Sequence, residues 1–407
     1  MLRNVFKTGI LKITTTSKEL RESTQLQQIP RNQETVDELF TRFNVKDVET
    51  NLLESAQFKN WDKAVSKVFG HRVFRANHAM MLRLTQQHGE KELSSILAAA
   101  KQVPDTKYVA VNLLRAQIEH WVEQKIPADK VFEYLKLDKA GDDLFTSLEL
   151  TRWMAYVGRT SGNPYKLLGR YLRRHYDDQG LANVLIKAKG GFAFGRFDYY
   201  RAENLILQKW VTSGKTTDEV YDLLKLQNVK ASEFLQNPAL DTWLTFVTKL
   251  DTRFYYSVEG PYKLLYERLI KQYDDKGLAD VILGPKGGFG EMFDAYKLDD
   301  LVIKKWVESG KTMDEVYDLL QLRNVDAINL LQTPALNTWL SFVERMDHPT
   351  HDSYKVLYNR LYPDLGQKTL LYLIRVAKKG DNARAKRIGE KLEKEFEANI
   401  AKYLRRT

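Results

Sequence analysis

The sequence predicts an all-α protein, an elongated tandem array of helical-bundle units, and three observations support this fold class. Long segments recur: LILQKWVTSGKTTDEVYDLLKLQNV at 205–229 returns as LVIKKWVESGKTMDEVYDLLQLRNV at 301–325, and PYKLLGRYLRRHYDDQGLANVL at 164–185 returns as PYKLLYERLIKQYDDKGLADVI at 261–282. Helix-start signals recur with these segments. No segment shows convincing strand alternation of apolar and polar residues. Repetition at this period indicates a tandem array, a class that presents binding surfaces far more often than catalytic sites.

Composition limits the classes of function. The chain has 407 residues, of which 43% are hydrophobic, so it holds enough apolar material for several small cores. It has no cysteine, which excludes disulfides and cysteine-bound zinc and is compatible with a reducing compartment. The formal charge of +10 is spread over 63 basic and 53 acidic residues, which favours a mildly basic surface over a nucleic-acid site. No run of about 18 apolar residues predicts a transmembrane helix.

Tryptophans mark the units of the array in two registers. The first register holds Trp121, Trp210 and Trp306, and the second holds Trp61, Trp153, Trp243 and Trp339. The opening unit lacks the first register, so we expect one short unit followed by three full units. The predicted segments are a flexible leader at 1–35, units at 36–108, 109–198, 199–294 and 295–383, and a tail helix at 384–407. Large aromatics at helical spacing are typical of small buried cores, so all seven tryptophans are predicted to be core residues.

Local signals predict about five short helices in each full unit. Thr216 with Glu219 and Thr312 with Glu315 form capping boxes before VYDLL, and Pro127 fits a first-turn position in the second unit. The tryptophan helices open at NP (237–238) and TP (333–334), where a capping residue precedes a first-turn proline.

The next helix of each unit is predicted from an apolar face. This face holds Tyr165, Leu168, Leu172 and Tyr176 in one unit and Tyr262, Leu265, Leu269 and Tyr273 in the next. The segments GLANVL and GLADVI follow, and each is expected to restart after a glycine that ends the preceding helix.

Two segments rich in glycine and phenylalanine separate the full units. KGGFAFGRF at 189–197 and KGGFGEMF at 286–293 lack the phosphate-loop arrangement and follow no predicted strand. Their position favours inter-unit junctions, where glycines allow a sharp turn and phenylalanines insert into the neighbouring unit. The predicted junction residues are Gly190, Gly191, Phe192, Phe197, Gly287, Gly288, Phe289 and Phe293.

Residue patterns that carry chemistry are not found. The pairs Asp177-Asp178 and Asp274-Asp275 consist of adjacent residues, which point about 100° apart on a helix, so capping or solvation is expected rather than catalysis. The seven histidines do not recur in register, and no metal is predicted even between 348 and 351, where two lie close together. We therefore predict no enzyme activity, no catalytic residue, no metal site and no cofactor.

The tail is predicted to be an amphipathic helix with a basic polar face. Its apolar residues are Ile388, Leu392, Phe396 and Ile400, one in every four. We expect it to cap the last unit, because a terminal repeat needs a polar outer face; membrane-surface binding and partner contact are the alternatives.

Together these residues resemble the WY and LWY repeats of secreted effectors from oomycete plant pathogens. The resemblance covers about 36–383, as one WY unit followed by three LWY units. The second tryptophan register matches the family's tryptophan, and Tyr165, Tyr262 and Tyr354 best match its tyrosine. The segments EHWVEQKIPADKVFEYLKL, QKWVTSGKTTDEVYDLLKL and KKWVESGKTMDEVYDLLQL match the additional LWY segment. The chain departs from the pattern in the first unit, where Asn77 or His78 replaces the tyrosine, and no signal peptide or Arg-x-Leu-Arg motif is found in 1–35.

The resemblance implies a non-enzymatic virulence effector, secreted by the pathogen and acting in the host cytoplasm or nucleus as a monomer that binds a host protein. In some members a pair of LWY units captures the scaffolding A subunit of protein phosphatase 2A and displaces its regulatory subunit, and we expect 109–294 to be such a pair. Positions where the copies differ are expected to carry specificity. The predicted partner contacts are Phe194, Arg196, Tyr199, Tyr200 and Arg201. The alternatives are an RNA-silencing suppressor that binds nucleic acid and a membrane or trafficking adaptor.

Overall fold

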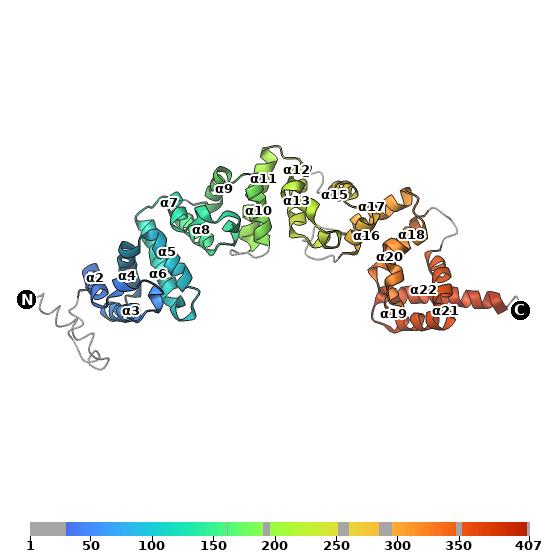
Figure 1. Cartoon of the computed structure of the whole chain (residues 1–407), viewed down its shortest axis with the longest axis horizontal. Helices are drawn as coiled ribbons and strands as arrows, with labels where there is room; N and C mark the ends of the chain where they lie inside the picture. The colour runs from blue at the N-terminus through green and yellow to red at the C-terminus, as the bar shows by residue number, and fades with distance from the viewer. Residues whose placement is uncertain are drawn as a thin grey trace, which may run out of the picture. The chain divides into compact units, whose positions relative to one another are not determined.

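The structure is a computed structural model that describes residues 30–160, 162–189, 196–250, 260–284, 295–346 and 352–404. Within these ranges every regular element is an α-helix or a short 3-10 helix, which confirms the predicted all-α class (Figure 1). The chain divides into two compact parts, Met1–Ile206 and Leu207–Thr407, and each is described by itself.

The N-terminal part contains the first nine described α-helices and the first half of α11. Its α-helices are α2 (Gln33–Arg42), α3 (Ala56–Phe69), α4 (Val73–His88), α5 (Glu90–Ala100), α6 (Pro104–Glu123), α7 (Ala128–Tyr134), α8 (Leu148–Thr160), α9 (Pro164–His175), α10 (Asp178–Lys189) and α11 (Arg196–Thr212). Its 3-10 helices are η3 (Val45–Asp47), η4 (Leu52–Glu54), η5 (Leu137–Lys139) and η6 (Gly141–Thr146). Helix α4 packs on α2, α3, α5 and α6, and α6 also contacts α8.

The C-terminal part begins with the last residues of α11. Its α-helices are α12 (Thr217–Leu223), α13 (Pro238–Leu250), α15 (Gly260–Gln272), α16 (Asp275–Leu283), α17 (Ala295–Glu308), α18 (Met313–Leu319), α19 (Ala327–Leu330), α20 (Pro334–Arg345), α21 (Ser353–Lys379) and α22 (Ala383–Leu404). Its 3-10 helices are η7 (Leu226–Asn228), η8 (Ala231–Gln236) and η9 (Leu322–Asn324). Helix α21 contains a break at Gly366, whose φ of 71° lies outside the helical region.

The second-register tryptophans hold each unit together in the same way. Trp61, Trp153, Trp243 and Trp339 are all 0% exposed. Each indole N–H donates to a backbone carbonyl about one helix upstream, on Val36, Ala128, Thr217 and Met313 respectively, at 2.8–3.1 Å. Each indole also meets an aromatic ring edge-to-face at 5.0–5.6 Å, from Phe40, Phe132, Tyr221 and Tyr317. Each tryptophan thus joins its own helix to an earlier one, because it packs on a ring of that helix and donates to a carbonyl near its start.

The first-register tryptophans are equally buried. Trp121, Trp210 and Trp306 are 0% exposed and lie near the ends of α6, α11 and α17. Helix α6 runs without a break across the predicted boundary between 108 and 109, so the first two units share one helix.

Helix starts in the structure confirm the capping signals. Thr216 and Glu219 at α12, and Thr312 and Glu315 at α18, form reciprocal capping boxes. At α20 the Thr333 hydroxyl accepts from the amide of Ala335, as a capping residue before proline should.

The glycines of GLANVL and GLADVI have a different role from the predicted one. They lie in the first turns of α10 and α16 rather than at the ends of the preceding helices, and the carboxylates of Asp177 and Asp274 accept from the amides of Gly180 and Gly277 at 2.7 Å. A Cβ on Gly277 would lie 2.8 Å from the Tyr273 Cβ, so close approach to a tyrosine explains this glycine. The aspartates are therefore caps, as their sequence position favoured.

The family-type tyrosines differ in burial. Tyr262 is 5% exposed, whereas Tyr165 and Tyr354 are half-buried. A basic side chain covers each ring: Arg201 over Tyr165 at 5.2 Å, Lys297 over Tyr262 at 5.3 Å and Lys391 over Tyr354 at 5.7 Å. These rings thus anchor a later helix through a cation–π contact as well as through burial.

The tail helix α22 packs along α21. Ile388, Leu392 and Phe396 are at most 5% exposed, whereas Ile400 is 39% exposed. The apolar face of the tail therefore packs within its own part over most of its length.

Candidate functional site

Three of the five predicted partner contacts do not contribute to the described surface. Phe194 lies outside the described residues, and Arg196 begins α11 with its side chain outside them. Tyr199 is 1% exposed, and its hydroxyl donates to the buried Glu203 carboxylate at 3.2 Å. The choice of Tyr199 as a surface contact is thus corrected, because its position on α11 faces the core.

The remaining two residues are exposed on the same helix. Tyr200 is 43% exposed, and Arg201 is exposed and lies over the ring of Tyr165 on α9. We call Tyr200 and Arg201 the α11 surface. Seven of the predicted junction residues lie outside the described residues, and the side chain of Phe197 does so too: Gly190, Gly191, Phe192, Gly287, Gly288, Phe289 and Phe293.

A basic side chain covers the aromatic partner of the tryptophan in three of the four units. Arg83 lies over Phe40 at 4.3 Å, Arg268 over Tyr221 at 5.0 Å and Arg360 over Tyr317 at 3.9 Å. An aspartate on the helix that carries the ring pairs with each arginine: Asp37, Asp218 and Asp314. In each of these three units an arginine thus lies over a ring that packs on the tryptophan, and the aspartate that pairs with the arginine belongs to the same unit. We call this arrangement the arginine column.

The second unit breaks this pattern. Tyr171 takes the place of the arginine and lies over Phe132 with ring centroids 3.8 Å apart, and His175 stacks on Tyr171 at 4.1 Å. Burial raises the pKa of Tyr171 to about 12, with the Asp138 carboxylate adding to the shift, so its hydroxyl stays neutral at physiological pH. Asp129 occupies the first turn of α7 where Asp218 occupies that of α12. This unit therefore lacks the arginine that neutralises the aspartate in the others.

A pocket of about 560 Å³ opens at this point. It is lined by Asp129, Glu133, Asp138, Leu167, Arg170, Tyr171, Arg174 and His175. We call this set the unit-2 pocket. The acidic side chains come from α7 and η5, and the basic and aromatic side chains come from α9. Such a mixed-charge rim suits a protein surface rather than an apolar small molecule, whose pockets are lined mainly by hydrophobic side chains.

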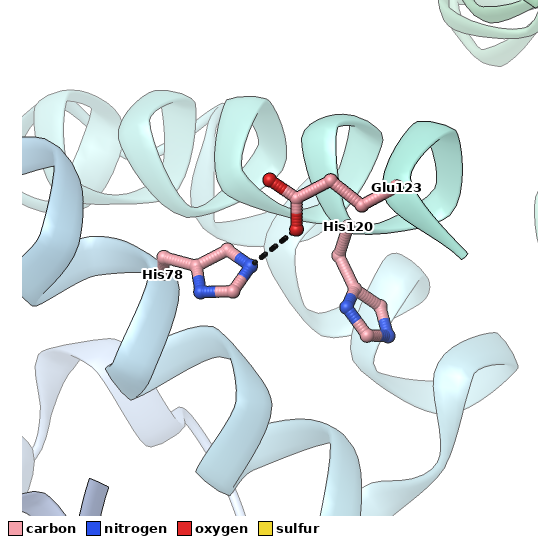
Figure 2. A group of neighbouring side chains, drawn as sticks. All are labelled: His78, His120 and Glu123. Atoms are coloured by element: carbon pink, nitrogen blue, oxygen red, sulfur yellow. Dashed lines mark ion pairs between the residues drawn. The ribbon is translucent and has the colours of Figure 1, made fainter. Parts of the chain in front are cut away.

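Side chains that are able to hold a metal meet at one place in the part of the chain that the structure describes. His78 on α4 faces Glu123 on α6, with His120 one turn away on α6 (Figure 2). Nε2 of His78 lies 3.4 Å from the Glu123 carboxylate, and the potential ligand atoms of all three residues lie within 4.8 Å of one another. Sequence patterns gave no signal for this group, because the two histidines are far apart in the chain and recur in no other unit. The pair between 348 and 351 includes residues outside the described ranges.

A buried polar network lies behind His120 and joins α5, α6 and α8. Glu90 accepts from the Trp121 indole at 2.9 Å and from the Gln117 amide at 3.0 Å. Arg152, only 8% exposed, donates to Gln117 at 3.0 Å and pairs with Glu149 at 2.5 Å. The network thus connects the first predicted unit to the second through hydrogen bonds between buried polar groups.

Among the described helices, none is long and apolar enough to span a bilayer.

Comparisons with known proteins identify relatives of one kind. No protein-family model matches the chain. The RxLR effector protein PSR2 of Phytophthora sojae is 27% identical over 314 residues, covering 76% of this chain and 45% of the relative. PSR2 of Phytophthora infestans is 28% identical over 364 residues, with 88% and 46% covered. The RxLR effector protein CRE15 of Phytophthora infestans is 28% identical over 279 residues, with 68% and 77% covered. The chain therefore spans a little under half the length of the two PSR2 relatives.

A solved structure supports the fold. The crystal structure of PcRxLR12 superposes with a TM-score of 0.58 at 24% identity, covering 91% of this chain and 86% of that chain. Both the relatives and the helical fold agree with the resemblance seen in the repeats. The chain is therefore homologous to the RxLR effector proteins of Phytophthora.

Proposed function

We propose that the chain is a non-enzymatic virulence effector, secreted by the pathogen, that acts in the plant cell cytoplasm or nucleus by binding a host protein. Two findings support the proposal. The relatives are named effector proteins, and the invariant parts of the repeat are used for packing: all seven tryptophans are buried. Specificity must then come from positions where the units differ.

The unit-2 pocket is the observation that best supports a binding surface in the second unit. In three units the arginine column is closed by the unit's own residues, whereas in the second unit Tyr171 replaces the arginine and a mixed-charge pocket remains at the surface. The α11 surface is joined to the same helix, α9, through the contact of Arg201 with Tyr165. Complementary charges arranged around an aromatic give an interface its orientation and partner choice more than its bulk affinity.

The partner that we propose is the scaffolding A subunit of protein phosphatase 2A. The resemblance to LWY-pair effectors suggests this partner, and the pocket lies within the segment 109–294 that the sequence favours for the contact. Binding is proposed to displace the regulatory subunit and so to redirect dephosphorylation. Nucleic-acid and membrane binding remain the alternatives, and no structural observation favours either.

Replacing Arg170 and Arg174 together by alanine is expected to weaken partner capture at least tenfold, because two exposed charges on the rim of the pocket are lost. Arg173→Ala is the matched control, since Arg173 is exposed on the same helix but does not line the pocket. The measurement is affinity purification from plant tissue followed by quantitative mass spectrometry.

The intact chain and Arg173→Ala are expected to recover scaffold and catalytic subunits of the phosphatase, with regulatory subunits depleted. Equal recovery by the double variant would exclude the unit-2 pocket as the contact. If the intact chain recovers no phosphatase subunit, the proposed partner is wrong.

A further inference from the structure

The cluster of His78, His120 and Glu123 lies outside the unit-2 pocket and the α11 surface and has no part in the proposed function. The geometry points to a binding site for a divalent transition-metal ion, with zinc as the best fit, that ties α4 to the end of α6. Such an ion would join the first predicted unit to the helix that it shares with the second.

The spacing of the three side chains fits a metal site. Zinc binds imidazole nitrogen and carboxylate oxygen at about 2.0–2.2 Å, so two ligands of a tetrahedral ion lie about 3.3–3.5 Å apart. Nε2 of His78 and the Glu123 carboxylate are already 3.4 Å apart, and the remaining ligand atom lies within 4.8 Å of both. His120 and Glu123 are three residues apart on one helix and thus share a face. A side-chain rotation of His120 would bring the third ligand to the same ion.

An unsatisfied atom supports the same conclusion. Nε2 of His78 is buried and makes no hydrogen bond, although the Glu123 carboxylate is near, so their geometry does not serve a simple hydrogen bond. Buried polar atoms in proteins are nearly always partnered, and an orphan among ligand-type side chains points to an absent partner. Two imidazoles and one carboxylate form a set that zinc binds while keeping a fourth position open to water.

A second carboxylate lies near His120, on the side away from the cluster. Oε1 of Glu90 lies 3.9 Å from Nε2 of His120, while the other carboxylate oxygen is held by Trp121 and Gln117. In metal sites a carboxylate commonly lies near one ring nitrogen of a histidine while the other nitrogen binds the metal. With Nε2 directed at Glu90, Nδ1 is the nitrogen that is left for the ion.

The site belongs to the first junction alone. His120 directly precedes Trp121, and the residue before the matching tryptophan is Lys209 in one unit and Lys305 in the other. Lys305 forms an ion pair with Asp275. At that junction a permanently charged lysine therefore binds the carboxylate. At the first junction His120 stands in place of this lysine and offers a nitrogen ligand instead of a charge. His78 of the first unit lies beside it.

The test uses the full chain freed of metal by chelation and titrated with Zn²⁺ by calorimetry and with Co²⁺ by visible spectroscopy. We expect one saturable site per chain, with cobalt absorption typical of a nitrogen- and oxygen-ligated ion of low coordination number.

His78→Ala and Glu123→Gln are each expected to weaken binding at least tenfold, and His71→Ala, an exposed histidine outside the cluster, is expected to leave it unchanged. Circular dichroism checks that each variant keeps its helical content, and Glu123→Gln provides a mild second variant should His78→Ala fold poorly. The inference is overturned if the intact chain shows no saturable binding, or if His71→Ala weakens binding as much as His78→Ala does. The phosphatase experiment is independent of this result, since none of its variants touches the cluster.

Discussion

Replacing Trp243 with alanine is expected to unfold its unit locally while leaving the first unit intact. Trp243 is 0% exposed, meets Tyr221 edge-to-face at 5.6 Å and donates to the Thr217 carbonyl at 2.8 Å. Loss of a buried tryptophan costs about 3–5 kcal/mol, and the stranded carbonyl adds about 1–3 kcal/mol. In a repeat array such a loss stays near its site, because each unit contacts only its neighbours.

Hydrogen exchange with mass spectrometry measures this effect segment by segment. Amides of α12 and α13 are expected to exchange roughly 100-fold faster or more in Trp243→Ala, since each 1.4 kcal/mol or so is a factor of ten. Trp243→Phe keeps an aromatic ring but loses the N–H, so a smaller acceleration is expected. Equal acceleration in α3 and α12 would contradict the view that each unit has its own tryptophan core.

Replacing Arg152 with methionine is the second substitution with a large expected effect. Arg152 is 8% exposed, pairs with Glu149 and donates to Gln117. Removing one partner of a buried ion pair costs about 3–5 kcal/mol; because 21% of the Glu149 side chain is exposed, we expect the lower end of this range. Faster hydrogen exchange in α6 and α8 is the measurement.

The double variant Arg152→Met with Glu149→Gln tests the physical reason. Methionine is close to arginine in length, and glutamine carries no charge that needs a partner, so part of the lost protection should return. If the loss of protection in the double variant equals the sum of the losses in Arg152→Met and Glu149→Gln alone, the two residues do not act as a pair.

Much of the fold could be predicted because the residues that recur in each unit are those that pack in its core. The tryptophan registers identified residues that the structure buries completely, and the capping boxes at Thr216 and Thr312 form as their sequence spacing required. Both signals are local: they depend on residue type and on helical spacing within a short segment.

Predictions failed where a side chain's environment depends on the partner helix. Tyr199 and Tyr200 are neighbours in sequence, yet one is 1% exposed and the other 43%, because they point to different sides of α11. Gly277 was predicted to end a helix, but it lies in the first turn of the next helix, against Tyr273. In each case the tertiary packing decided a point that sequence spacing left open.

The two candidate sites differ in how much signal they leave in the sequence. Comparing units in register exposes the substitution of Tyr171 for an arginine once the arginine column is known from the structure. The metal-type cluster leaves no comparable signal, because His78 and His120 come together only when α4 packs against α6. Comparing the units finds residues that recur, so it does not find a site whose residues occur in one unit alone.

Direct titration of the purified chain into purified phosphatase 2A scaffold A subunit tests whether this subunit binds through the second unit. At physiological salt we predict saturable one-to-one binding with a Kd of about 1 μM or tighter, as an interface of standard size supports. Arg173→Ala should bind equally well, and the Arg170→Ala, Arg174→Ala double variant at least tenfold more weakly. Absence of binding by a chain with full helical content would show that the scaffold A subunit is not the partner.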